Sequence, residues 1–534
     1  MTLPTLPEDI VLQVLQYLEA HDLLRLQLAS RTCRTAFSDP SYLRTILKCH
    51  NLAREVRALP RALLTTSDIT LSDQWLLQST FYILATRYYH LTQGRARTIQ
   101  HLNLRALDQS GHWFPTPQWD YHESQPGGRL YHESAAAHLR GMGWKPYLFR
   151  QTLWDYDDGV VVCAPAKAQD RVPAKQAERS SEDTCLRAMG LETGAEAEVP
   201  FDVTGKIIRN LKLKERVLIV EWAEKEAFHE LNMVDKVHRH FATCYDVTIT
   251  NTDKNNPSLN VKYRSEWRIH FLGLPLSTRD YFFSTHTATH YALYYWQPNR
   301  SLWTGDEDQP IEALFIWDIT SPSSYRPSLD PSQVRARHGE GFGTLGEGPR
   351  RVARYGMHEL EWLGIRQHAS ISLIKIELDS ENKVLIWREN RFVSGQGYFD
   401  PAERCWESRN VSFPFVGDGC VQERMGDVET VSYRGHCSMD SQEVEGEVEG
   451  WFLPVSEVGD GNDGVRYGLI ETCFTGLVVE NRILVRVRLV QDGEWRNLQD
   501  ELVKQLGAMG RICGDERWVI GQNEKLQIVI ARFQ

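Results

Sequence analysis

Hydrophobic residues along the chain follow two different spacings. From residue 6 to about residue 105 they recur every three or four positions, whereas from about residue 146 onward they form short runs separated by Gly, Asp, Asn and Pro. The first spacing is typical of amphipathic helices and the second of β-strands. We therefore expect a multidomain α+β protein with an all-α N-terminal part and an all-β C-terminal part.

The first 48 residues are predicted to form three or four short helices. One helix begins after Pro7, and its apolar stripe consists of Ile10, Val11, Val14, Leu15 and Leu18. Asp22 is expected to cap a second helix, and Ser41 a further one after the Asp39-Pro40 break. Because so small a unit cannot bury all of its leucines, we expect a partner protein to cover the remainder.

A longer helix is predicted over about Asp73–Thr92, capped by Ser72 and ended by Gly94. Apolar residues, Trp75 among them, lie on every face of this helix, which predicts that it is buried on all sides. Residues 49–145 as a whole are interpreted as a helical spacer between the two parts.

Residues 146–534 are predicted to form the β part. Its strands are expected at Gly159–Cys163, Val217–Trp222, Phe241–Ile249, Glu266–Phe271, Tyr281–Thr285, Tyr291–Trp296, Ala313–Ile319, Ile371–Leu378, Lys383–Trp387, Gly450–Val455, Tyr467–Phe474, Gly476–Glu480, Arg482–Leu489, Trp518–Gly521 and Gln527–Phe533. Antiparallel strands joined by short turns, with no helices between them, are typical of barrels, sandwiches and propellers.

A recurring motif favours the propeller. Short apolar runs end in Trp222, Trp317 and Trp387, which indicates a degenerate repeat, although three Trp-Asp pairs lack the regular spacing of true WD repeats. At about 40–50 residues per blade, the β part has room for roughly six to eight blades. Gln527–Phe533 is expected to complete a blade begun near residues 147–163, since a closed ring leaves no sheet edge open.

Three segments are expected to be flexible insertions in this propeller-like domain. They lie near residues 164–200, 328–351 and 440–450, and they are rich in small, charged or turn-forming residues. The last of them carries glutamates on alternate positions, at Glu443, Glu445, Glu447 and Glu449.

Composition and charge narrow the range of functions. A hydrophobic content of 42% and a charged content of 25% are those of a folded globular protein. The net charge of −11 argues against nucleic acid as a partner, because an acidic body repels phosphate, and it favours a partner segment with positive charge. No secretion signal, no apolar run of about 20 residues and no Cys-x-x-Cys pair is present. We therefore expect a cytoplasmic or nuclear protein with reduced thiols and no membrane partner.

The sequence offers little support for catalysis or cofactor binding. Four histidines could converge on zinc, but no Cys or carboxylate stands at a matching spacing, and such histidines more often hydrogen-bond the backbone of a core. They are His238, His240, His286 and His290. The glycines of residues 341–346 match a dinucleotide fingerprint without the strand and helix that this fingerprint requires. We expect no catalytic residue, no metal and no cofactor.

The N-terminal helices carry a specific series of residues. Leu6-Pro7-Glu8 is followed by the pair Ile10-Val11 and then by Leu18, Asp22-Leu23, Cys33-Arg34, Phe37 and Asp39-Pro40. This series resembles the F-box family, in which the aromatic position held here by Phe37 is usually Trp. The resemblance implies helices that dock on a Skp-type adaptor and, through it, on the cullin and RING subunits of a ubiquitin ligase.

The resemblance also implies which side chains contact the adaptor. They are Leu6, Pro7, Ile10, Val11, Val14, Leu15, Leu18, Leu23, Leu24, Leu28, Cys33, Phe37 and Leu43. In the β part, residues 237–243, 266–272 and 283–291 look similar to segments of fungal F-box proteins, a likeness that implies no known substrate.

The sequence thus predicts a non-enzymatic substrate-recognition subunit of an SCF-type ubiquitin ligase. Residues 1–48 would bind the adaptor, and the β part would bind a protein client destined for ubiquitin-dependent degradation. Two alternatives stay open, namely an F-box scaffold that leads to no ubiquitylation and an enzyme built on the propeller. Neither the client nor its binding residues follow from the sequence.

Overall fold

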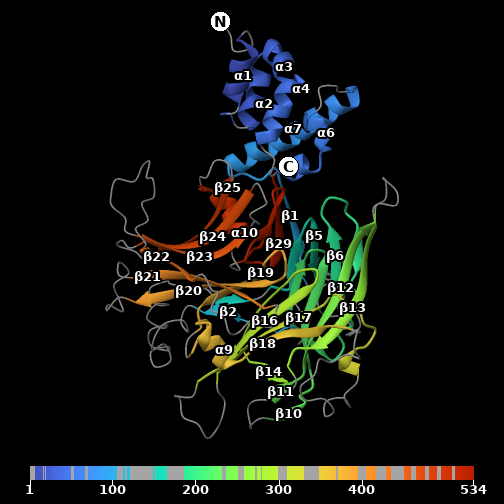
Figure 1. Ribbon diagram of the computed structural model, residues 1–534, viewed down its shortest axis with the longest axis vertical. Helices are drawn as coiled ribbons and strands as arrows, with labels where there is room; N and C mark the ends of the chain where they lie inside the picture. The colour runs from blue at the N-terminus through green and yellow to red at the C-terminus, as the bar shows by residue number, and fades with distance from the viewer. Residues whose placement is uncertain are drawn as a thin grey trace, which may run out of the picture. The chain divides into compact units, whose positions relative to one another are not determined.

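A computed structural model gives the fold of the chain (Figure 1). The structure describes residues 6–15, 17–18, 20–49, 53–65, 70–104, 112–114, 117–120, 148–150, 152–164, 186–230, 236–250, 258–270, 273–277, 280–298, 309–329, 348–368, 371–394, 404–415, 428–434, 450–458, 465–474, 480–489, 495–507 and 511–534. The chain divides into two compact units. Unit 1 comprises Met1–Leu102, Leu453–Thr472 and Arg482–Gln534, and unit 2 comprises Asn103–Phe452 and Cys473–Asn481.

This division differs from the predicted boundary at residue 146. The C-terminal strands of unit 1 are grouped with the N-terminal helices, because their apolar side chains share one core with them. The predicted single β domain over 146–534 stays a prediction.

The N-terminal helices of unit 1 confirm the predicted helical start of the chain. They are α1 (Glu8–Leu15), α2 (Ala20–Ala29), α3 (Arg31–Phe37), α4 (Pro40–Cys49), α5 (Arg54–Arg57), α6 (Arg61–Thr65) and α7 (Leu71–Thr92). Ser30 caps α3 by accepting a hydrogen bond from the Cys33 amide at 3.0 Å. The side chain of Asp39, rather than that of Ser41, accepts the first free amide of α4, with 2.8 Å to the Ser41 nitrogen.

Helix α7 begins and packs differently from the sequence expectation. Its N-cap is Thr70, which forms a reciprocal capping box with Asp73, so Ser72 is not the cap. The side chain of Trp75 is 70% exposed, so the helix is not buried on all sides. One face packs in the core of unit 1 and the opposite face is exposed.

The predicted helical spacer over 49–145 is helical only as far as Thr92 in the described residues. Residues Thr98–Asn103 form strand β1, and its sheet has the order β1–β29–β28–β27. The other strands of this sheet are β27 (Cys513–Gly514), β28 (Trp518–Gln522) and β29 (Gln527–Arg532). The last strand thus pairs with β1 and not with a strand near residues 147–163, which corrects the predicted closure.

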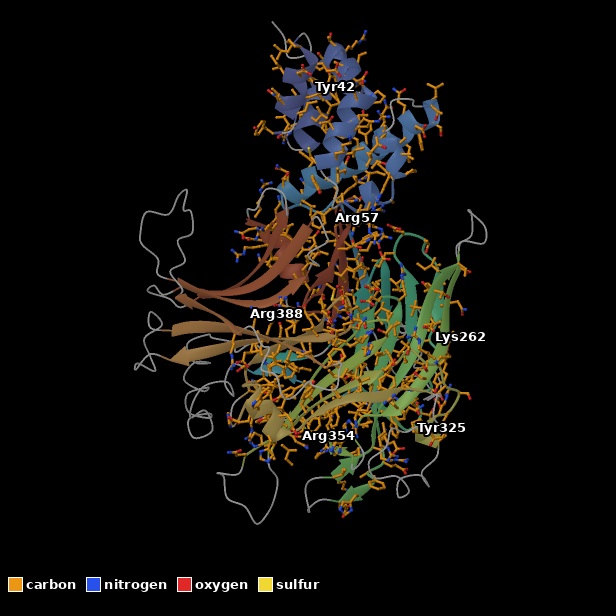
Figure 2. The ribbon with its side chains drawn as sticks, viewed as in Figure 1. Tyr42, Arg57, Lys262, Tyr325, Arg354 and Arg388 are labelled. Carbon is orange, nitrogen blue, oxygen red and sulfur yellow. The ribbon has the colours of Figure 1, made fainter. Side chains whose placement is uncertain are left out.

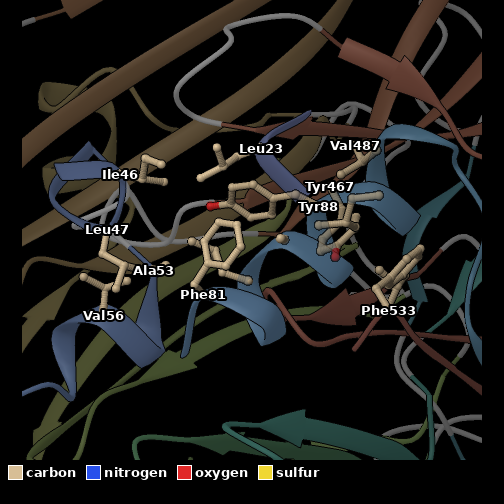
Figure 3. Close-up of a cluster of buried hydrophobic side chains, with 14 of the residues drawn as sticks. Leu23, Ile46, Leu47, Ala53, Val56, Phe81, Tyr88, Tyr467, Val487 and Phe533 are labelled. Carbon is tan, nitrogen blue, oxygen red and sulfur yellow. The ribbon is translucent and has the colours of Figure 1, made fainter. Parts of the chain in front are cut away.

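The remaining strands with residues in unit 1 belong to a sheet of order β23–β24–β25–β26. Their bounds are β23 (Gly450–Val458), β24 (Val465–Phe474), β25 (Glu480–Leu489) and β26 (Trp495–Asn497), followed by helix α10 (Asp500–Leu506). Apolar side chains of these strands and of the N-terminal helices meet in one buried cluster (Figure 3). Among the residues that Figure 3 labels are Leu23, Ile46, Phe81 and Tyr88 from helices and Tyr467, Val487 and Phe533 from the C-terminal segments.

Unit 2 contains four antiparallel sheets of four strands each among its described residues. The first comprises β4 (Trp154–Asp157), β5 (Val160–Cys163), β6 (Arg187–Gly190) and β7 (Glu196–Glu198). The second comprises β8 (Lys206–Lys214), β9 (Val217–Glu224), β12 (His240–Thr250) and β13 (Ser258–Arg268). The third comprises β15 (Tyr281–His286), β16 (His290–Gln297), β17 (Ile311–Asp318) and β18 (Arg350–Tyr355). The fourth comprises β19 (Leu373–Leu378), β20 (Val384–Ser394), β21 (Arg404–Pro414) and β22 (Val428–Arg434).

The first strands of these sheets lie next to one another. Strand β4 contacts β8, β8 contacts β15, and β15 contacts β19. A short sheet of β2 (Pro117–Asp120) and β3 (Leu148–Arg150) packs against β15 and β19. Residues 112–114 also reach β8, because the Phe114 amide donates to the carbonyl of Ile208 at 2.9 Å. The edges of the first strands are therefore partly covered by the chain itself.

Smaller elements complete unit 2. A three-stranded sheet joins β10 (His229–Glu230), β11 (Lys236–His238) and β14 (Leu274–Pro275), and α9 (Met357–Trp362) follows β18. Of the predicted insertions, residues 187–198 form strands β6 and β7, and Arg350 already belongs to β18. Residues 165–185, 330–347 and 440–449 lie outside the described residues.

The tryptophan repeat does not fall on equivalent strands. Trp222 and Trp387 lie on the second strands of their sheets, β9 and β20, whereas Trp317 lies on the third strand, β17. Two of the three runs thus mark the same position in a sheet.

Candidate functional site

The surface of α1–α4 is the first candidate, and buried contacts fix the arrangement of its helices. The side-chain amide of Gln27, only 2% exposed, donates to the carbonyl of Phe37 at 2.8 Å and so joins α2 to the end of α3. Helix α2 also packs against α3 and α7, and α1 against α4. The helices therefore present a defined outer face.

Five of the thirteen predicted adaptor contacts are core residues. Each is at most 1% exposed, and all five lie in the buried cluster of unit 1. They are Val11, Leu15, Leu23, Phe37 and Leu43. While the helices stay packed, these side chains hold them in place. Their assignment as direct adaptor contacts stays a prediction.

The other eight predicted contacts remain accessible to different extents. Leu28 is 66% exposed, Ile10 is 46% exposed, and Pro7 is exposed. Leu6, Val14, Leu18, Leu24 and Cys33 are half-buried. Tyr17, which the sequence interpretation omitted, is 89% exposed directly after α1. Another protein could bury apolar side chains that α1 and α2 leave exposed in this way.

Charged groups border this apolar surface. Arg25 pairs with Asp22 at 3.3 Å, and its guanidinium carbon lies 5.6 Å from the centre of the Tyr89 ring on α7. Burial, followed by the nearby charges of Glu8 and Asp39, raises the pKa of Tyr42. Tyr42 therefore remains a neutral hydroxyl at physiological pH.

The four histidines considered for zinc do not converge. Ring nitrogens of His238 and His240 lie 2.8 Å and 3.1 Å from the carbonyl oxygens of Glu224 and Leu274. Ring nitrogens of His286 face two backbone carbonyls, and His290 bonds to the hydroxyl of Thr289. Among the described residues no group of three or more Cys, His, Asp or Glu side chains could hold a metal ion.

Unit 2 contains a fully buried cation, Arg209, that the sequence interpretation missed. The register of β8 on β9 shifts between Ile208 and Asn210, so Arg209 is the extra residue of a β-bulge. Its guanidinium lies 5.1 Å and 5.2 Å from the ring centres of Phe114 and Phe282. Burial lowers the pKa of Arg209 to about 10, an effect that nearby carboxylates oppose, so it stays charged. In the sequence Arg209 follows the apolar pair Ile207-Ile208 on a strand that also carries Lys206, Lys212 and Lys214, so nothing in the pattern set it apart.

Buried glutamates bridge neighbouring sheets of unit 2. Glu221 on β9 accepts hydrogen bonds from Ser284 on β15 and from Tyr291 on β16, the latter at 3.0 Å. Glu312 on β17 accepts from Tyr294 at 2.8 Å and from the Gln367 amide at 3.0 Å.

The second bridge continues to β20. The Gln367 side chain donates to Glu389 at 2.7 Å, and the Trp387 indole donates to the same carboxylate at 3.1 Å. Carboxylates that accept hydrogen bonds from several elements in this way hold neighbouring sheets together.

Comparison with known proteins bears on the N-terminal helices. The F-box-like family matches residues 3–48, the segment that forms α1–α4. No curated protein sequence matches the chain.

Two solved structures show a distant likeness. A chain of the crystal structure of the Mitotic Checkpoint Complex is 7% identical, covers 72% of this chain and 90% of its own length, and gives a TM-score of 0.27. The Trypanosoma rangeli sialidase in complex with the inhibitor DANA is 9% identical, with 82% and 60% coverage and a TM-score of 0.31. Neither likeness is close enough to define a fold or an activity. The family match, together with the helices found at the same positions, identifies residues 3–48 as an F-box-like domain.

Proposed function

We propose that the protein is the substrate-recognition subunit of an SCF-type cullin–RING ubiquitin ligase. The N-terminal helices bind a Skp-type adaptor, which links them to the cullin and RING subunits, and the sheets recruit a protein client. The observation that carries the proposal is the F-box-like match over residues 3–48, which coincides with α1–α4.

The chain needs no chemistry of its own in this role. In the cytoplasm or nucleus it holds a client close to the charged ubiquitin-conjugating enzyme, so the lysine of the client meets ubiquitin at a high effective concentration.

The apolar surface of the F-box-like domain supports adaptor binding. Leu28 and Ile10 are large aliphatic side chains left exposed after the core of the helices has formed. Each such side chain contributes about 1.5–3 kcal/mol when a partner buries it. Two anchors therefore account for a substantial part of a micromolar or tighter affinity.

For the sheets we propose a propeller-like domain of six to eight blades. Support comes from their order, because each successive four-stranded sheet uses strands close together in the chain. The exception is the last sheet, in which β1 joins β27, β28 and β29. Such a pairing of an early strand with the last strands closes a ring of blades without an open seam.

Adaptor capture tests the proposal. In a pull-down with a purified Skp-type adaptor, the double variant Ile10→Asp/Leu28→Asp should lose binding by a factor of about 100 or more. The matched control is Ile311→Asp/Leu329→Asp, whose side chains in unit 2 are 43% and 76% exposed. Wild-type capture by the first variant, or equal loss by both, would contradict the assignment of the docking face.

A reconstituted reaction with cullin, RING subunit and ubiquitin separates a ligase subunit from a scaffold. Co-purification of a client from cells followed by ubiquitylation of that client in vitro would support the ligase role. Capture of adaptor and client without any modification of the client would favour the scaffold.

A further inference from the structure

Strand β18 carries three arginines at the edge of its sheet. It is the last strand of the sheet β15–β16–β17–β18, and no hydrogen bond joins its outer edge over Arg350–Arg354 to another described residue. Arg350, Arg351 and Arg354 are exposed, and none of them pairs with a carboxylate of the described residues. Figure 2 labels Arg354.

The three arginines concentrate positive charge on a protein that is acidic overall. The chain carries 71 acidic and 60 Lys or Arg side chains, and several of its arginines pair with a carboxylate. Arg187, Arg216 and Arg388, for example, each pair with one within 3.3 Å. Arg350, Arg351 and Arg354 lie on a strand that carries no carboxylate of its own, and together they form a local positive surface.

A β-bulge places two of these arginines on one face of the sheet. Trp317 pairs with Arg351 and Phe315 pairs with Arg354, while Val352 is the extra residue between them. Since Phe315 and Trp317 are two positions apart on β17, their side chains point to the same side, and so do those of Arg351 and Arg354.

Aromatic contacts hold both guanidiniums in place. The guanidinium carbons of Arg351 and Arg354 each lie 5.9 Å from the centre of the Phe315 ring. Phe315 in turn stacks on Tyr295 with ring centres 6.0 Å apart. Burial and, to a smaller extent, the like charge of Arg354 lower the pKa of Arg351. An anion between them would relieve this repulsion.

We propose that β18 is the docking edge for an extended, carboxylate-rich segment of the client, which adds to the sheet as a further strand. Backbone groups of the segment would pair with the open edge, and acidic side chains on alternate positions would meet Arg351 and Arg354. Positive charge on the edge selects a segment of opposite sign. Exposed Val352, 37% accessible, offers a small apolar contact between the charges.

The local charge outweighs the net charge of −11, which by itself favours a basic partner. At physiological salt, charges separated by more than about 8 Å are largely screened. A segment bound on β18 therefore senses the three arginines more strongly than carboxylates elsewhere on the molecule.

Fluorescence anisotropy on the full chain tests the proposal. The probe is a labelled ten-residue peptide with Glu on alternate positions and Thr between them, compared with a peptide in which Gln replaces every Glu. The wild type should bind the first probe, with an affinity that falls as salt rises, and should not bind the second. Arg351→Gln/Arg354→Gln should weaken binding about tenfold.

The matched control removes two positive charges elsewhere in unit 2. Arg388→Gln/Lys262→Gln changes the net charge by the same amount at exposed positions, both labelled in Figure 2. Equal weakening by both double variants would overturn the local site and leave only general charge attraction. A peptide with N-methyl groups on alternate residues should lose binding, and its undiminished binding would overturn strand addition.

A further experiment tests whether the glutamates of the chain's own 440–450 segment occupy the β18 edge. If a variant with Gln at Glu443, Glu445, Glu447 and Glu449 binds the probe much more tightly than wild type, that segment itself is the occupant and the partner assignment is wrong. The inference rests on the proposed client-binding role. Adaptor capture measured on the same preparation distinguishes the failure of the docking edge from the failure of that role.

Discussion

The buried ion cluster of Arg87 gives the sharpest stability prediction. Arg87 on α7 is fully buried, and its guanidinium bonds to Glu55 on α5 and, at 2.6 Å, to Glu516 before β28. It also donates to the side chain of Gln534 at 3.3 Å. One cation therefore connects the helices of unit 1 to its C-terminal segment. The perturbation is Arg87→Met, which keeps an unbranched side chain and removes the charge.

The expected loss of stability follows from the groups that Arg87→Met leaves without a partner charge. The Glu516 side chain is 3% exposed, so without Arg87 its carboxylate stays buried without the guanidinium that neutralises it, although it still accepts from the Arg54 amide at 3.2 Å. Removing one partner of a buried pair costs about 3–5 kcal/mol. Although burial lowers the pKa of Arg87, the charges of Glu55 and Glu516 raise it by more, which agrees with a net favourable pairing.

A compensating variant separates charge from packing. Arg87→Met/Glu516→Met removes both charges of the most buried pair and fills the space with apolar groups. Such a replacement of a buried pair is often neutral or stabilising, so we expect it to recover most of the lost stability. Arg25→Met serves as the surface control, because the Arg25 and Asp22 side chains are 56% and 39% exposed, and its loss should stay below about 1 kcal/mol.

Native-state hydrogen exchange is the appropriate assay, because it reports on unit 1 separately from unit 2. We expect Arg87→Met to lower the protection of α7 and of β28 and β29 together, while β12 and β16 of unit 2 keep theirs. A loss below about 1 kcal/mol in α7, or a double variant no more stable than Arg87→Met, would refute the reasoning.

Two further predictions concern acid stability and close packing. Burial lowers the pKa of His270 to about 4 and that of His240 well below its usual value, so both histidines fold in the neutral form. The unfolded chain takes up protons on these histidines below about pH 6.5, so their contribution to stability is full above that pH and falls towards pH 4. The urea midpoint should therefore be lower at pH 5 than at pH 7. His240→Phe, which keeps the stacking on Phe282, should reduce this difference. Gly521→Ala should destabilise β28 by about 1–3 kcal/mol, measured by hydrogen exchange, because a Cβ at this position would lie 2.2 Å from the carbonyl oxygen of Leu506. Unchanged protection of β28 would contradict the packing of α10 on this strand.

Central strands and terminal strands of the sheets differed in how well the sequence predicted them. The apolar runs ending at Trp222 and Trp317 lie on β9 and β17, inside their sheets, and both were predicted. Strands β8 and β18 were not, because Lys206–Lys214 and Arg350–Tyr355 interrupt their apolar residues with positive charge. Terminal strands commonly carry charge on the open edge, so their periodicity is weak.

The sequence also could not show which side chains of the F-box-like helices are exposed. The motif located the helices correctly, yet it could not separate Leu15, which is 1% exposed, from Leu28, which is 66% exposed. Both are leucines on short helices, and only the packing of those helices on α7 decides which side is covered. Likewise, β1 looked like part of a spacer, because its partner β29 lies more than 400 positions later in the sequence.

The continuity of the unit 1 core bears on how the adaptor-binding role must be studied. Leu23 and Ile46 of the F-box-like helices belong to the same buried cluster as Tyr467 and Phe533, and Tyr88 of α7 lies in that cluster too (Figure 3). A fragment that ends after α7 would therefore expose apolar surface that the C-terminal segments cover in the full chain. That surface would bind other proteins non-specifically. Adaptor binding by the exposed face of α1 and α2 can be distinguished from such binding only in the full chain, where Leu28 and Ile10 remain exposed while the core is closed.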